Sequence, residues 1–225
     1  SVMGKYDEAA KLFKSGYGAL SNLIERFDKL KKQSGALPYM PRPENAAKTQ
    51  RENTFPTYVK AKSILDAEVG EFPTLDFGAG KGLSQGLGFD TYEPFPMRKG
   101  FNPTFTSPKE IADNSYKRLT NLYVLNVVPR EIRDTIVKDI GRVLSPDGTA
   151  VITTRGKEVL DAKGSLGPEN MSIITSADTY QKGFTKKELQ NYLQETLGDN
   201  FEVTPIKLGE VGAKVKKLST SKEID

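Results

Sequence analysis

Three glycines alternate along one short stretch of the chain, directly after a run of mostly apolar residues. Gly78, Gly80 and Gly82 follow residues 73–77, a run in which Asp76 is the only charged residue. Glycine has no Cβ, so the backbone can turn sharply here and approach a ligand closely. A helix that begins behind such a loop adds free amide donors. We therefore predict a loop for a nucleoside-type ligand, formed by Asp76, Gly78, Ala79, Gly80 and Gly82.

A second acid lies where such a ligand would need it. Glu93 follows Asp76 by 17 residues and ends another candidate strand, 89–93. A carboxylate at that place can accept hydrogen bonds from both hydroxyls of a ribose. Two other nucleotide loops fit less well, because Leu83 replaces the third glycine of the dinucleotide motif and Lys81 is not followed by Ser or Thr. A glycine turn without any ligand stays as the alternative.

The residue types that are absent limit the chemistry further. The chain has no Cys, His or Trp. It therefore has no disulfide, no thiolate nucleophile, no imidazole base and no metal site of the usual nitrogen or sulfur kind, and we expect no metal. Catalysis must depend on carboxylates, amides, hydroxyls, Lys, Arg or a bound cofactor.

Length and composition are those of a globular α/β protein. The chain has 225 residues and a net charge of +4, which suits one or two domains. No apolar run approaches the about 20 residues of a membrane span, and the N-terminus lacks the apolar stretch of a signal peptide. We expect a cytoplasmic protein without a membrane partner.

The elements that position the glycine loop follow from hydrophobic spacing. Short apolar runs alternate with helical patterns from residue 72 onward, which is typical of a doubly wound, mainly parallel sheet. We expect helices at 132–144 and 185–197, the second begun by a capping box of Thr185 and Glu188. The last two runs should form an antiparallel hairpin through residues 208–210. The predicted strands are 73–77, 89–93, 119–126, 149–154, 201–206 and 212–218.

Positive charge is concentrated near the N-terminus. Residues 1–64 hold 12 Lys and Arg against 6 acids, whereas residues 65–225 hold 21 against 23. Apolar spacing within residues 6–32 predicts two amphipathic helices, and a proline-rich connection precedes a further helix from Thr57. We divide the chain into a basic helical extension or lid, 1–52, and a main domain, 53–225. The basic face is the best indication of a nucleic-acid partner.

Three motifs together resemble the class I S-adenosylmethionine-dependent methyltransferases. The stretch LDFGAGKG is similar to their first motif, Glu93 in TYEPF to their ribose-binding acid, and residues 142–148 to the turn before their fifth strand. The resemblance covers residues 55–218. It implies a seven-stranded Rossmann-like sheet and S-adenosyl-L-methionine as the cofactor. It also suggests Asp113 as the acid that contacts adenine.

The loop after the fourth strand of that family would hold the methyl acceptor. Asn126 could accept a hydrogen bond from an acceptor amine and contact the cofactor, and Pro129 would shape the loop. Amino-methylating DNA enzymes have a related Asn and Pro motif there. The competing interpretation is an Asn that caps the helix starting near Arg130.

Other contacts are predicted around this loop. Thr54 and Tyr58 could fold over the cofactor, unless Thr54 or Thr57 simply caps a helix. Arg155 could reach an anionic group or lie on the surface. In a loop before the capped helix, Tyr180 could stack on a base and Lys182 could meet a phosphate, or the aromatic could merely pack the loop.

The leading hypothesis is a methyltransferase that modifies a nucleic acid at an exocyclic base nitrogen such as adenine N6. In-line methyl transfer depends mainly on positioning, which suits a chain without His or Cys. The first alternative is a small-molecule methyltransferase with the N-terminal helices as a lid. The second is a non-catalytic cofactor-binding protein or inhibitor.

Overall fold

The structure is a computed structural model and describes residues 39–219. The helices expected within residues 6–32, and most of the basic N-terminal segment, lie outside the described residues. The boundary proposed at residue 53 stays a prediction. Within residues 39–219, no helix is both long enough and apolar enough to cross a bilayer.

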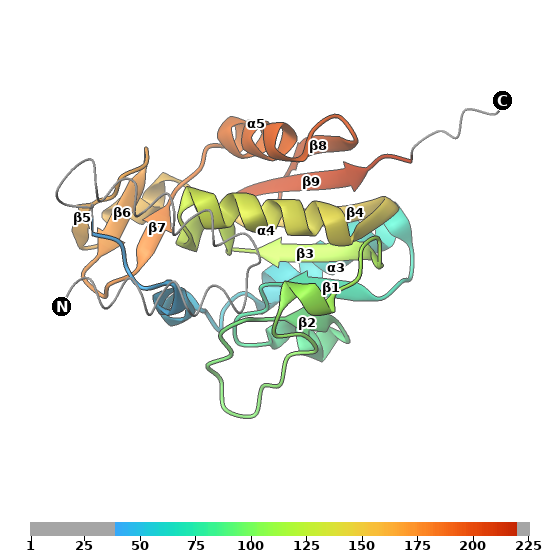
Figure 1. Cartoon of the computed structure of the whole chain (residues 1–225), viewed down its shortest axis with the longest axis horizontal. Coiled ribbons are helices and arrows are strands. Elements are labelled where there is room, and N and C mark those ends of the chain that lie inside the picture. The colour runs from blue at the N-terminus through green and yellow to red at the C-terminus, as the bar shows by residue number, and fades with distance from the viewer. Residues whose placement is uncertain (1–38, 220–225) are drawn as a thin grey trace.

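The predicted main sheet is present, and Figure 1 shows it at the centre of the molecule. Its order is β2-β1-β3-β4-β9-β8; the first four strands are parallel, and β9 pairs antiparallel with both β4 and β8. The closing hairpin is thus confirmed. The strands are β1 (Thr74–Phe77), β2 (Asp90–Tyr92), β3 (Tyr116–Leu122), β4 (Leu144–Thr154), β8 (Phe201–Ile206) and β9 (Val211–Lys217).

The expected seventh strand is not found among the described residues. Beyond β2, the chain makes only an isolated bridge between Tyr92 and Phe105. The hydroxyls of Thr91 and Thr104 each accept the other residue's backbone N–H, at 3.1 and 2.9 Å. Residues 94–108 include four prolines, which cannot donate to a strand ladder. This edge of the sheet is therefore closed by an irregular segment.

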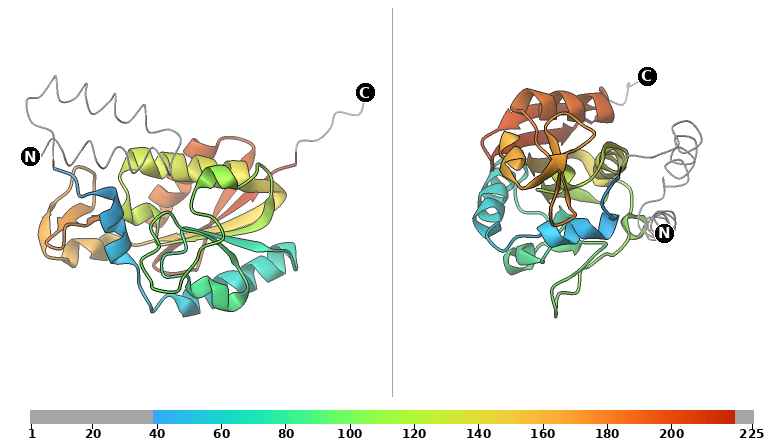
Figure 2. Two further views of the ribbon diagram at one scale, coloured as in Figure 1. Left: turned by 60° about the horizontal axis from the view of Figure 1, so that its bottom comes forward. Right: turned by 90° about the vertical axis from the view of Figure 1, so that its left-hand side faces the viewer.

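Helices cover both faces of the sheet (Figure 2). α4 (Arg130–Val143) and α5 (Lys186–Leu197) pack on one face, and α3 (Phe55–Val69) packs on the other. The alternation along β4 follows this arrangement: Ala150 and Ile152 belong to the core under α4 and α5, whereas Val151 faces α3. The helices predicted within residues 39–219 are thus present, with their ends shifted by at most two residues.

Two chain segments at the carboxyl ends of the strands differ from expectation. β3 ends at Leu122, four residues earlier than predicted, because Tyr123 has a left-handed φ of 59° and turns the chain into the short helix η4 (Leu125–Val127). The glycine loop is followed only by η2 (Leu83–Leu87), a single 3₁₀ segment. The other short 3₁₀ segments are η1 (Pro43–Thr49), η3 (Pro108–Glu110) and η5 (Lys157–Asp161).

A second, smaller sheet was not predicted. Its antiparallel strands β5 (Gly164–Leu166), β6 (Ser172–Thr175) and β7 (Tyr180–Lys182) lie beyond one end of the main sheet (Figure 1). The prediction that residues 180–184 form only a loop is therefore wrong. β7 packs against η4, which places this small sheet beside the carboxyl end of β3.

The start of α5 confirms the predicted capping box. The Glu188 N–H donates to the Thr185 hydroxyl at 3.0 Å, and the Thr185 N–H donates to the Glu188 carboxylate at 3.4 Å. Thr185→Ala should lower the free energy of unfolding by about 1 kcal/mol, because it removes one of these bonds. Urea denaturation would measure the loss. Thr185→Ser should retain most of the stability, and equal midpoints for wild type and Thr185→Ala would contradict this account.

Candidate active site

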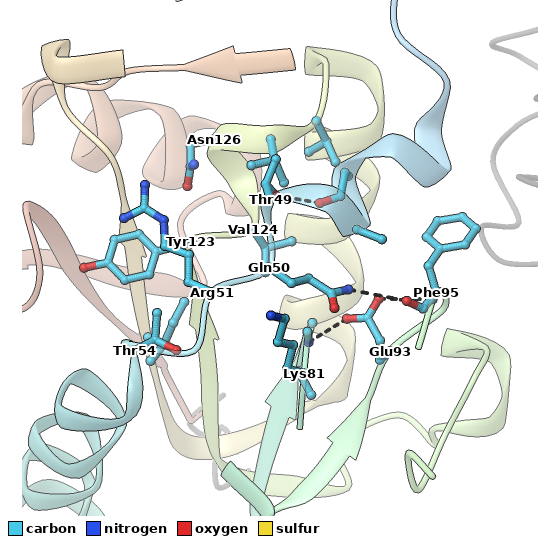
Figure 3. Close-up of a pocket in the computed structure, with 18 of the residues that line it drawn as sticks. Thr49, Gln50, Arg51, Thr54, Lys81, Glu93, Phe95, Tyr123, Val124 and Asn126 are labelled. Atoms are coloured by element: carbon cyan, nitrogen blue, oxygen red, sulfur yellow. Dashed lines mark hydrogen bonds between the residues drawn. The ribbon is translucent and has the colours of Figure 1, made fainter. Parts of the chain in front are cut away.

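A pocket extends along the carboxyl ends of four neighbouring strands (Figure 3). Glu93 follows β2, the glycine loop follows β1, Asn126 follows β3 and Arg155 follows β4. Open α/β sheets bind ligands at this edge. The opposite wall includes residues of η1 and of β7. The predicted site residues that line the pocket are Thr54, Tyr58, Gly78, Ala79, Gly80, Glu93, Asn126 and Arg155.

The glycines of the loop are required by its geometry. Gly78 has φ 99°, and a Cβ there would lie 2.5 Å from Cγ2 of Val124. Gly80 has φ 57° and donates its N–H to the Glu93 carboxylate at 2.7 Å. Because that N–H is already engaged by protein, the loop offers close approach rather than a row of free amide donors.

Glu93 is a buried acid at the floor of the pocket, with 7% of its surface exposed. Its two oxygens accept the N–H of Gly80 at 2.7 Å and that of Phe95 at 3.0 Å. Burial raises the pKa of Glu93 to about 7, although the two backbone hydrogen bonds oppose the shift. The carboxylate therefore ionises near neutral pH and is fixed in one orientation.

Asp76 does not line the pocket, in contrast to its predicted role in cofactor contact. It is fully buried and accepts hydrogen bonds from the hydroxyls of Ser84, at 2.6 Å, and Thr120, at 2.9 Å. Tyr58 also hydrogen-bonds to it, and burial raises the pKa of Asp76 to about 6. Asp76 thus ties β1 to η2 and β3, which positions the glycine loop.

Because of Asp76 and Glu93, we expect the stability of the protein to fall as pH rises. Both have pKa values raised above those of the unfolded chain, so the native state holds their protons more tightly, and stability is lost as pH increases through about 4 to 7. Between pH 5.5 and pH 8 the free energy of unfolding should fall by on the order of 2 kcal/mol. Urea titrations at several pH values would measure it. In Glu93→Gln the free energy of unfolding should depend much less on pH above pH 6. An unchanged pH dependence would show that Glu93 is not its cause.

Asn126 is almost completely buried, with 1% exposed, and its Oδ1 has no hydrogen-bond partner among the described residues. The alternative that it caps the next helix is wrong: the residue at the N-cap of α4 is Pro129, and no side chain caps that end. Pro129 itself lies outside the pocket lining, where it starts α4 after the η4 turn. Asn126 therefore stays available to a ligand.

Two further predicted residues lie elsewhere. Asp113 precedes β3, at the amino ends of the strands and opposite the pocket; its side chain is 71% exposed and pairs with Arg142 at 2.8 Å. Its predicted contact with adenine is therefore wrong. Gly82 begins η2, and a Cβ there would lie 2.3 Å from Cδ2 of Phe101, so this glycine admits a neighbouring ring rather than a ligand.

The predicted roles of Tyr180 and Lys182 in binding a base and a phosphate are wrong as well. Both side chains are buried in β7: Tyr180 donates its hydroxyl to Glu169, and Lys182 pairs with Glu188 at 2.6 Å. Side chains alternate along a strand, so the residue between them points the other way. That residue is Gln181, which lines the pocket.

Arg155 and Thr54 both reach the lining, each with a local interaction of its own. Arg155 pairs with Glu158 at 3.3 Å through Nε. Thr54 occupies the N-cap position of α3, but its side chain makes no capping hydrogen bond. The predicted role in binding stays open for both.

Sequence reasoning missed several residues that complete the pocket, among them Gln50, Arg51, Phe95 and Gln181. The Oε1 atoms of Gln50 and Gln181 are buried without a partner in the described chain. Gln50 also donates to the Phe95 carbonyl at 3.4 Å, beside Glu93 (Figure 3). Isolated neutral amides have no sequence pattern that could have identified them.

Comparison with known proteins supports the fold. No protein-family model matches the chain, and no curated protein sequence does. A S-adenosylmethionine-dependent methyltransferase from Thermotoga maritima aligns with a TM-score of 0.50 at 13% identity, over 74% of this chain and 94% of that one. CalS10, an amino pentose methyltransferase from Micromonospora echinaspora solved with the cofactor bound, aligns with a TM-score of 0.51 at 12% identity, over 81% and 99%. The chain thus has the Rossmann-like fold of class I S-adenosylmethionine-dependent methyltransferases.

Proposed function

We propose that the protein is an S-adenosylmethionine-dependent methyltransferase. One observation supports this most strongly: the glycine loop and a buried carboxylate meet in one pocket, where the Gly80 N–H holds Glu93 in place at 2.7 Å. The motif spacing predicts that pair of features, and the fold is the one in which such enzymes are built.

The chemistry of the pocket fits this cofactor. S-adenosylmethionine has hydroxyl and amino groups that donate hydrogen bonds, and the pocket is rich in acceptors. Glu93 would hold the ribose hydroxyls, and the buried amide oxygen of Gln50, beside Glu93, lacks a partner among the described residues. Lys81 lines the pocket as well and pairs with the exposed Glu52 at 3.1 Å, a partner that it would exchange for the cofactor's carboxylate.

When bound, the cofactor supplies a methyl group on a sulfonium for in-line displacement. The residues of this chain contribute orientation and shielding from water, which can account for much of the acceleration of such a reaction. Asn126 can fix a donor group of the acceptor. Neither His nor Cys is present to act as a base or nucleophile, so we expect acceptors that need no strong base.

The acceptor that we favour is a small molecule. Tyr180 and Lys182, which were expected to contact a nucleic acid, are buried in the small sheet. That sheet and η1 are joined where Asn45 donates to the Asp178 carbonyl at 2.9 Å, and both contribute to the wall of the pocket. Modification of a nucleic acid at adenine N6 is the alternative, and its main support, the basic segment, lies outside the described residues.

Calorimetry followed by a transfer assay tests this proposal. Purified protein should release or absorb heat with S-adenosylmethionine and S-adenosylhomocysteine. Tritiated methyl groups should then enter the small-molecule fraction of a metabolite extract. Label in added DNA or RNA would support the nucleic-acid alternative, and binding without any transfer would support a non-catalytic protein. Absence of binding would overturn all three.

A further inference from the structure

Two unsatisfied amides line the pocket from neighbouring elements. Asn126 comes from η4 and Gln181 from β7, two elements that pack against each other. Their exposed fractions are 1% and 8%, both line the pocket, and neither amide oxygen has a hydrogen-bond partner among residues 39–219. A buried polar atom without a partner costs free energy unless a ligand or water satisfies it.

We propose that Asn126 and Gln181 recognise the methyl acceptor, and that this acceptor has an N–H donor directly beside an acceptor atom and no positive charge, as in a lactam or an aminopyridine. This inference rests on the proposed methyltransferase function. A primary amide has a carbonyl oxygen and an NH₂ group side by side. Its best partner is an edge with the reverse order of donor and acceptor, and side-chain amides recognise the edge of adenine in this way.

The position of the pair assigns it to the acceptor rather than to the cofactor. Glu93 and the glycine loop follow β2 and β1, whereas η4 follows β3 and β7 belongs to the small sheet inserted after β4. Figure 3 shows Glu93 beside Gln50 and Phe95, with Asn126 at a separate part of the pocket. The small sheet supplies Gln181 from outside the main sheet, so this wall can differ between enzymes that share the cofactor-binding edge.

The surroundings disfavour a cationic acceptor. Arg51, Lys81 and Arg155 all line the pocket. Val128 and Ile132 add apolar lining. A cation would lose its hydration here and meet like charge, whereas a flat heterocycle without positive charge would satisfy both the amides and the aliphatic carbons.

The experiment uses two probes of similar size with the full chain saturated by S-adenosylhomocysteine. 2-Pyridone has the donor beside the acceptor, and toluene has neither. Protein-observed or ligand-observed NMR titration at pH 8 should show 2-pyridone binding about tenfold more tightly than toluene, the effect of one or two net hydrogen bonds. Gln181→Leu, which keeps the side-chain size, should abolish that preference while toluene binding stays within about twofold.

Two controls keep the result interpretable. Calorimetry with S-adenosylhomocysteine on each variant shows whether the cofactor end of the pocket is intact, and Gln181→Met keeps the shape if the leucine variant does not fold. Because a thioether offers no donor and only a weak acceptor, Gln181→Met should also lose the preference for 2-pyridone. If S-adenosylhomocysteine binds normally but wild type shows no preference for 2-pyridone over toluene, this inference is wrong and the proposed function is unaffected. The same conclusion follows if both variants retain the preference. Absence of S-adenosylhomocysteine binding overturns the proposed function and this inference with it.

Discussion

Replacing Arg133 with alanine is expected to lower the free energy of unfolding by about 3–5 kcal/mol, the usual cost of removing one partner of a buried ion pair. Arg133 is a buried residue of α4, with 2% exposed, and binds both oxygens of Glu169 at 2.9 and 3.0 Å. It also donates to the carbonyls of Leu125, at 2.9 Å, and Val128, at 2.8 Å. Alanine would leave the two carbonyls without this donor, and Glu169 would keep the hydrogen bond from Tyr180 but lose its charged partner.

The same contacts connect the two elements that supply Asn126 and Gln181. Leu125 and Val128 flank Asn126 in the chain, and Glu169 lies in the turn between β5 and β6 of the sheet that supplies Gln181. Arg133 is therefore a positioning residue. Where Arg133→Ala still folds, it should lose the preference for 2-pyridone over toluene while it retains affinity for S-adenosylhomocysteine.

A double-mutant cycle with Glu169→Gln tests whether the pair itself is responsible. The double variant should be less destabilised than the sum of the single variants, because the uncompensated charge is absent. Urea denaturation at pH 7.5 supplies all four free energies. A loss below about 1 kcal/mol for Arg133→Ala, typical of an exposed ion pair, would show that the contact contributes little.

Most of the main sheet was predictable because its longer strands are apolar and alternate with amphipathic helices, while the short strands β1 and β2 end at the glycine loop and at Glu93. Residues 149–154 are buried on both faces, and the pattern of α4 places Ile136, Val137 and Ile140 on one side. The small sheet offered no such pattern. Its strands have three or four residues, and β5 is exposed along its whole length, so no alternation marks it. The small sheet is connected to α4 by an ion pair between Glu169 and Arg133, which lies 36 residues earlier in the chain.

The site was predictable where function requires a particular residue type at a fixed spacing. Gly78, Gly80 and Glu93 meet that condition, and all three line the pocket. Predictions failed where the orientation of a side chain had to be known. A loop at residues 180–182 would leave any side chain free to reach a ligand, so Tyr180 and Lys182 were predicted to bind. In the strand β7 the side chains alternate, and it is Gln181 that lines the pocket.

Replacing Glu93 with glutamine is expected to weaken cofactor binding by about 30-fold at pH 8, since hydrogen bonds to a charged group contribute roughly 1.5–3 kcal/mol. Burial raises the pKa of Glu93 to about 7 in the free protein. Ribose hydroxyls donate to the ionised form, so binding should lower this pKa and release a proton. In wild type, affinity for S-adenosylhomocysteine should therefore fall by up to about tenfold from pH 8 to pH 6.

Calorimetry of S-adenosylhomocysteine binding in two buffers of different ionisation enthalpy would measure both the affinity and the released proton. The matched control is Asp113→Asn: it removes the other acid that the motifs suggested, but its side chain lies at the opposite edge of the sheet and pairs with Arg142. That variant should bind like wild type at every pH, whereas Glu93→Gln should bind weakly and without the pH dependence. Wild-type affinity in Glu93→Gln, or an equal loss in Asp113→Asn, would remove Glu93 from the cofactor site, because a carboxylate that accepts the ribose hydroxyls cannot be exchanged for an amide without cost.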